Sequence, residues 1–150
     1  MLFWFAGTAV ASVWFIFRDP KFDYRYLIIG ALLPDAVDVW FGSAGPFHSF
    51  ATSVALLILA MLVSIGSRPR RKRLLAGVIG VFLHLVFDGA FLDTKMFWWP
   101  FGGIGLSSEQ LPSIERGWWN LFFELAGIAL CIWTWRRVRV TVSQPISGVL

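Results

Sequence analysis

The sequence has few charged residues, a single cysteine and two histidines. Asp, Glu, Lys and Arg together make up 15% of its 150 residues, whereas about 25% is usual in a soluble globular domain. Hydrophobic residues make up 57% and aromatic residues 17%. A chain this apolar does not have the composition of an ordinary soluble domain, and its length suits one domain.

The single cysteine and the distribution of charge argue against a disulfide-stabilised protein and against a nucleic-acid-binding protein. Cys131 has no partner within the chain for a disulfide, and its apolar surroundings predict a packing role. The formal net charge of +4 could indicate a nucleic-acid partner. However, the basic residues stand beside apolar segments, which is typical of membrane topology and anionic lipid headgroups. We therefore expect a lipid bilayer as partner, and no nucleic acid.

The apolar residues fall into five segments, which predict an all-α, polytopic transmembrane helical bundle formed by one integral membrane domain, residues 1–150. Helices are expected because backbone polar groups in a bilayer must be satisfied internally, and no segment alternates like a barrel strand. Pro34 should kink the second segment or end its first half, so that segment could be broken or re-entrant. The segments are Leu2–Phe17, Tyr26–Phe41, Phe50–Ile65, Leu74–Leu92 and Trp118–Trp135.

The basic residues predict an orientation for this bundle. With five spans, the groups at 18–25, 68–73 and 136–139 all fall on one side, and they hold 11 of the 13 Lys and Arg residues. By the positive-inside rule, that side is cytoplasmic. We expect a multi-pass protein of the inner (cytoplasmic) membrane of a bacterium, with its N-terminus outside and its C-terminus in the cytoplasm.

Six ionisable residues stand in or beside the apolar segments, where such groups are costly and usually functional. Spacings of three and four residues place Asp35 beside Asp38, and His84 beside Asp88, on one face of a helix. In the five-span topology all six lie at a similar depth, toward the outer leaflet. They are Asp35, Asp38, His48, His84, Asp88 and Glu124.

This group of residues predicts a divalent metal site, because unpaired carboxylates there would neutralise or repel one another. Imidazole and carboxylate ligands suit zinc best, with manganese or iron as alternatives. The expected metal ligands are Asp35, Asp38, His48, His84 and Asp88. The carboxylates expected to take part in catalysis are Asp35, Asp38, Asp88 and Glu124.

Each residue also has a structural alternative. Asp35 could cap the second half of a broken helix. His48 and Ser49 could form a turn that caps the third segment. His84 and Asp88 could be hydrogen-bonded to fix helix packing. Glu124 could equally be a structural partner of a histidine or an arginine.

At these residues the chain resembles a known family. The order is Gly30-Ala31-Leu32-Leu33-Pro34-Asp35-x-x-Asp38, then His48-Ser49, His84-x-x-x-Asp88 and Trp99-Pro100-Phe101. This is similar to the membrane-bound metal-dependent hydrolase family, also described as LexA-binding, inner-membrane-associated hydrolases. The resemblance covers about half of the chain. It implies a small helical inner-membrane protein whose metal site consists of Asp35, Asp38, His48, His84 and Asp88.

These observations favour a membrane-embedded, metal-dependent hydrolase with its site toward the extracytoplasmic leaflet. Its substrate would be a lipid-linked ester or phosphoester, because the site is reached from the membrane or from outside. One alternative is a small, non-catalytic accessory subunit of a larger membrane complex, or a homo-oligomer. An ion or metal transporter ranks lower, because one cluster near one face makes a poor two-sided pathway.

Overall fold

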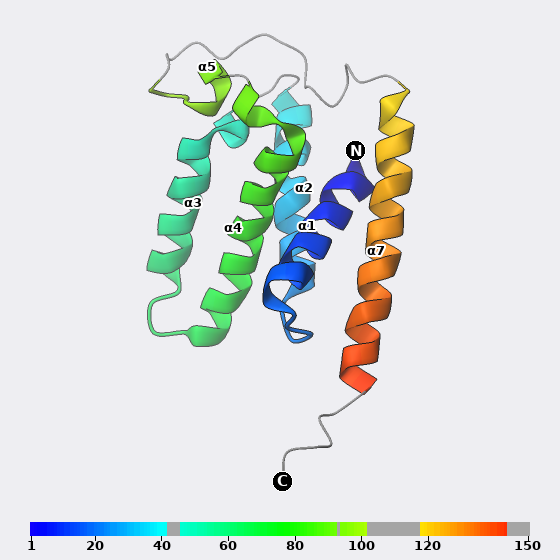
Figure 1. Ribbon diagram of the computed structural model, residues 1–150. Coiled ribbons are helices and arrows are strands. Elements are labelled where there is room, and N and C mark those ends of the chain that lie inside the picture. Colours follow the sequence, from blue (N-terminus) through cyan, green and yellow to red (C-terminus); the bar gives the residue numbers. More distant parts are fainter. Residues whose placement is uncertain (42–45, 93, 102–117, 144–150) are drawn as a thin grey trace.

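A computed structural model describes residues 1–41, 46–92, 94–101 and 118–143, without the side chains of 38–41, 46, 96 and 143. The described residues are helical and contain no strand, so the expected all-α class is confirmed. Five long helices account for most of the chain (Figure 1). They are α1 (Leu2–Phe17), α2 (Tyr24–Phe41), α3 (Phe50–Val63), α4 (Arg68–Asp88) and α7 (Trp119–Ser143). The short helices are η1 (Pro46–His48), η2 (Ala90–Leu92) and α5 (Thr94–Phe97).

Local sequence signals set several of the helix ends. Ser49 is the N-cap of α3, and its side-chain oxygen accepts a hydrogen bond from the Thr52 backbone N–H at 3.2 Å. Gly89 ends α4 in the left-handed region, with φ of 78°, which glycine adopts without steric cost. Arg18 ends α1 in the same region, with φ of 48°, although it carries a Cβ.

Two helices extend well beyond the expected segments. Helix α4 begins at Arg68, so the basic run is its first turns rather than a loop. Helix α7 continues to Ser143, beyond the expected end at Trp135. Lysine and arginine are good helix formers, so the loss of apolar character at these positions does not end the helix.

Pro34 does not end the first half of the second segment, because α2 runs as one helix from Tyr24 to Phe41 with Pro34 inside it, so the possible break is not found. Proline lacks the N–H that would bond the carbonyl of Gly30, and its ring crowds that carbonyl. The buried Pro34 nevertheless lies within the part of α2 that packs along α4. Leu33, the residue before the proline, packs against the buried cluster that includes Val81 and Leu85 of α4, and this contact favours a continuous helix.

The five apolar segments were expected to form a transmembrane bundle, although several are shorter than the ~20 residues of a perpendicular span. Among the residues that the structure describes, no helix combines the length and the apolar character required of a full membrane span.

Two pairs of helices approach closely at glycines. A Cβ on Gly30 of α2 would lie 1.9 Å from the Gly77 carbonyl oxygen of α4. A Cβ on Gly7 of α1 would lie 2.3 Å from the Gly127 carbonyl oxygen of α7. Neither position has room for a side chain, and these contacts hold α2 against α4 and α1 against α7.

The helices form a bundle in which α1 lies between α7 and the α2–α4 pair, while α3 packs on the other side of α4 (Figure 1). Helices α1 and α7 run in the same direction. The turn after α1, the turn between α3 and α4, and the end of α7 lie at one end of the bundle. The three basic groups therefore share one end, as predicted, and η1 and the end of α4 lie at the other.

Candidate metal centre

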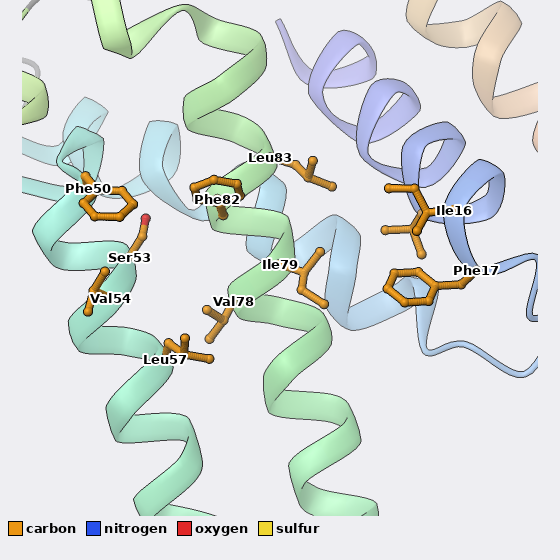
Figure 2. A pocket seen from close by; sticks show the side chains of 11 residues that line it. Ile16, Phe17, Phe50, Ser53, Val54, Leu57, Val78, Ile79, Phe82 and Leu83 are labelled. Atoms are coloured by element: carbon orange, nitrogen blue, oxygen red, sulfur yellow. The ribbon is translucent and has the colours of Figure 1, made fainter.

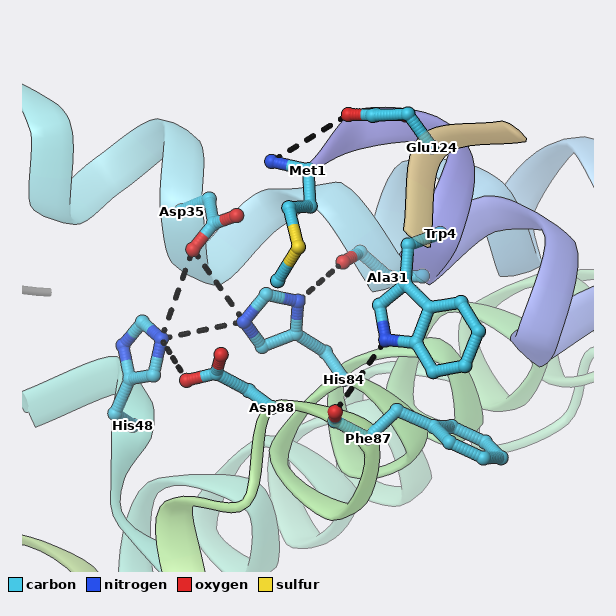
Figure 3. A network of polar contacts seen from close by, with 9 residues as sticks. All are labelled: Met1, Trp4, Ala31, Asp35, His48, His84, Phe87, Asp88 and Glu124. Carbon is cyan, nitrogen blue, oxygen red and sulfur yellow. Dashed lines mark hydrogen bonds and ion pairs between the residues drawn. The ribbon is translucent and has the colours of Figure 1, made fainter. Parts of the chain in front are cut away.

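Asp35, His48 and His84 come together at one end of the bundle, each from a different element (Figure 3). The Nε2 atoms of His48 and His84 are 3.2 Å apart. Asp35 Oδ1 lies 3.5 Å from His84 Nε2 and 3.7 Å from His48 Nε2. The side chains supplied by α2, η1 and α4 thus direct three potential ligand atoms at one point, and the cluster could hold a metal ion.

The His84 ring is fixed by its other nitrogen. Nδ1 lies 2.8 Å from the carbonyl oxygen of Ala31, one turn before Asp35 on α2. Since a carbonyl oxygen can only accept, Nδ1 carries a proton, and in the neutral form of the ring the lone pair of Nε2 faces His48 and Asp35. Phe5 of α1 packs against the ring, with centroids 4.0 Å apart, and both side chains are buried. Histidine ligands of metals commonly donate the N–H of their second ring nitrogen to a carbonyl or carboxylate, as His84 does to Ala31.

His48 is positioned by the start of α3. It ends η1, and the next residue, Ser49, is the N-cap of α3. The expected structural role of this dipeptide, capping the third segment, is therefore confirmed for Ser49. Capping by Ser49 and the inward position of the buried His48 are compatible, because the two side chains perform different tasks.

Asp88 is adjacent to the cluster. It lies one turn after His84 on α4, is 2% exposed, and places Oδ2 3.8 Å from His48 Nε2. Figure 3 shows its carboxylate beside the two imidazoles, on the same side as His48. The spacing of four residues thus brings His84 and Asp88 to the same site, as expected.

The distances fit a tetrahedral metal. Two nitrogen ligands, each about 2.1 Å from a zinc ion, are about 3.4 Å apart at tetrahedral angles. The three separations of 3.2, 3.5 and 3.7 Å bracket that value. Two imidazoles and one carboxylate also form a donor set known in catalytic zinc sites, which leave one position for water. The residues present therefore fit a divalent transition metal.

Glu124 is not part of the cluster of possible ligands. Its Oε2 accepts a hydrogen bond from the Phe3 backbone N–H at 2.8 Å, and Oε1 lies 3.7 Å from the Met1 amino nitrogen. Figure 3 shows the carboxylate turned toward Met1, with the Met1 side chain between it and His84. Glu124 of α7 therefore places its carboxylate at the N-terminal end of α1, where the helix dipole favours negative charge.

We predict that Glu124→Ala destabilises the fold without affecting the metal centre. The Phe3 N–H loses its acceptor, which should lower the free energy of unfolding by about 1 kcal/mol. Thermal unfolding and metal content of the purified protein measure the two effects. Glu124→Gln is the control, because its amide oxygen can still accept from Phe3. Loss of metal in Glu124→Ala would contradict this assignment.

One expected residue cannot be placed at the site, and two residues that were not expected contribute to it. Asp38 lies in α2, but its side chain is outside the part of the chain that the structure describes. The Ala31 carbonyl and the Phe5 ring orient His84 but were not expected. A backbone acceptor has no sequence signal, and Phe5 resembles every other aromatic residue of an apolar helix.

Comparisons with known proteins do not place the chain in a family. No family model, no curated protein and no solved structure matches it. The resemblance in the motifs around Asp35, His48 and His84 therefore remains an interpretation of the sequence, and the geometry of the cluster carries the functional argument.

Proposed function

We propose that the protein is a membrane-embedded, metal-dependent hydrolase. The observation that carries this proposal is the convergence of His48 Nε2, His84 Nε2 and Asp35 Oδ1 within 3.7 Å of one another. The three residues come from separate elements, and one of the two imidazoles has a fixed tautomer. Zinc is the metal that suits this donor set best, with manganese or iron as alternatives.

In this proposal, the roles of the residues follow from their positions. Asp35, His48 and His84 would hold the metal, and a bound metal would supply the acidity needed to activate a water molecule near neutral pH. Asp88 stands next to the ligands, where its carboxylate can accept the proton of the attacking water. A substrate that carries a phosphoryl or acyl group would be attacked at this end of the bundle.

The surface of the bundle supports a membrane location. Large apolar side chains are exposed along every long helix, which is unusual for a protein surrounded by water. Examples from four helices are Phe15, Ile29, Leu62 and Leu125. We propose that lipid covers these faces, and that the basic end lies at the cytoplasmic surface of the inner membrane with the metal centre at the opposite leaflet.

An apolar groove supports a lipid-linked substrate. It lies between α1, α3 and α4, has a volume of about 470 Å³, and is lined by apolar side chains together with Ser53 (Figure 2). This volume is within the ~300–1,000 Å³ range of small-molecule sites. Phe50 at one end of the groove follows the metal ligand His48 by two residues. An acyl chain in the groove would bring an adjacent ester or phosphoester toward the metal centre.

The proposal predicts that Asp88→Asn abolishes turnover but leaves metal binding intact. The asparagine has nearly the same shape but cannot accept the proton, and loss of a general base typically costs about 10²–10⁴-fold in rate. The measurement is hydrolysis of a fluorogenic phosphatidyl ester and of bis(4-nitrophenyl) phosphate by the zinc-, manganese- or iron-loaded protein in detergent.

The matched control is Asp19→Asn, which removes a carboxylate in the turn after α1 at the opposite end of the bundle. It should hydrolyse the probes at the wild-type rate. Metal-loaded wild-type protein that hydrolyses neither phosphoesters nor carboxylic esters would overturn the proposed activity. Equal rates for the wild type and Asp88→Asn would exclude the role of Asp88.

A further inference from the structure

A second groove lies between α1 and α7, at the basic end of the bundle. It has a volume of about 480 Å³. Helix α1 and its C-cap contribute Trp14, Phe15 and Arg18, and α7 contributes Trp133, Arg137 and Thr141. This groove is separate from the metal centre, which lies near the first turn of α1, at the other end of a helix of 16 residues.

The lining residues form two layers. On α1, Arg18 follows Trp14 by four residues, and on α7, Arg137 follows Trp133 by four residues. Because α1 and α7 run in the same direction, both arginines lie one helical turn, about 6 Å, further toward the basic end than the tryptophans. The groove is therefore aromatic toward the middle of the bundle and cationic toward its end.

The two guanidinium groups are available to an anion. Within the described part of the chain, neither Arg18 nor Arg137 forms an ion pair with a carboxylate. The Arg137 guanidinium lies over the Trp133 ring, 5.6 Å from its centroid, which restricts its orientation. Two arginines facing one groove are well suited to a phosphate group, because a guanidinium can donate two parallel hydrogen bonds to it.

We infer that this groove binds the headgroup of an anionic phospholipid. The phosphate would lie between Arg18 and Arg137, and the glycerol and first acyl carbons would lie against Trp14, Phe15 and Trp133. A free phosphate ion would use the cationic layer alone and leave the aromatic layer without a role. Tryptophan and arginine at adjacent depths are also the arrangement expected at a membrane interface.

The backbone at Arg18 allows a test that leaves the fold intact. Arg18 ends α1 with φ of 48°, a conformation that is strained for a residue with a Cβ and unstrained for glycine. Arg18→Gly therefore removes the guanidinium while relieving strain, and the variant should melt at or above the wild-type temperature. An effect of this variant on lipid binding cannot then be attributed to unfolding.

The experiment compares the binding of dioctanoyl phosphatidylglycerol, dioctanoyl phosphatidylcholine and inorganic phosphate to the full-length protein in detergent. The wild type should bind phosphatidylglycerol most tightly. Arg18→Gly and Arg137→Gln should each weaken that binding about fivefold, the effect of one favourable charge near an anionic lipid. Arg136→Gln is the matched control, because Arg136 is the neighbour of Arg137 on α7 but does not line the groove. Because an exposed charge outside the groove is screened by salt, its effect should be below about twofold.

Three results would overturn the inference. Equal losses in Arg136→Gln and Arg137→Gln would mean that phosphatidylglycerol responds to overall charge. Equal binding of phosphatidylcholine and phosphatidylglycerol would exclude selection of an anionic headgroup. Inorganic phosphate that binds as tightly as phosphatidylglycerol would make this a free-phosphate site. Metal content, measured in the same samples, should be unchanged in every variant, which keeps this test independent of the proposed hydrolase activity.

Discussion

Purified His84→Ala protein should contain no bound transition metal, whereas the wild type should contain about one equivalent of zinc, manganese or iron. The substitution removes one of three ligands and leaves the Ala31 carbonyl without its donor. Loss of a residue that only supports a metal ligand costs about 10–100-fold in affinity. Loss of the ligand itself should exceed that, and elemental analysis of the detergent-purified protein measures the outcome.

His48→Ala provides a second, independent removal of a ligand and should give the same result. Thr134→Ala is the control, because Thr134 is also polar and fully buried but lies on α7, which contributes no residue to the cluster. It should retain the wild-type metal content. Stoichiometric metal in His84→Ala, or a folded wild type that binds none of the three metals when they are supplied, would contradict the metal centre.

Gly30→Ala should destabilise the protein and weaken metal binding. The added methyl group would meet the backbone of α4 at Gly77, and backbone cannot move aside as a flexible side chain can. Overpacking of this kind typically costs about 1–3 kcal/mol. A wider separation of α2 and α4 would also move Asp35 away from His84. Thermal unfolding and metal titration should both detect the change.

Gly77→Ala is the matched control at the same helix crossing, and it should leave the stability of the protein unchanged or raise it. A Cβ on Gly77 would lie 3.6 Å from the Tyr26 carbonyl oxygen, which is ordinary van der Waals contact. Alanine favours a helix over glycine by up to about 1 kcal/mol, so this variant should be as stable as the wild type or more stable. Equal destabilisation by both substitutions would show that the helices are not arranged as described.

The positions of the long helices were predictable because apolar runs, and the polar, proline or glycine residues that end them, are visible in neighbouring residues of the sequence. The expected segment Leu2–Phe17 coincides with α1, and α3 begins at Phe50 as expected. The end of α7 was not predictable in the same way. Its last turns contain Arg136, Arg137 and Arg139, and hydropathy records where apolar character stops rather than where helical hydrogen bonding stops.

Most of the candidate site was also predictable, because buried ionisable residues are rare and costly. The structure brings Asp35, His48, His84 and Asp88 together, although 49 residues separate Asp35 from His84. Glu124 was expected at the same depth. Depth in a bundle fixes one coordinate only, and the position around the bundle axis depends on which helices pack together. Because α7 packs on α1, Glu124 meets the start of that helix instead.

The packing of α7 has a consequence for how the chain assembles during synthesis. Among the described elements, α7 makes extensive contact with α1 alone, and every residue of the proposed metal centre precedes it in the sequence. Ribosomes deliver the chain from its N-terminus, and early elements can associate before late ones emerge. Helices α1 to α4 can thus assemble the proposed metal centre in the nascent chain before α7 docks on α1 and completes the groove that holds Arg18 and Arg137.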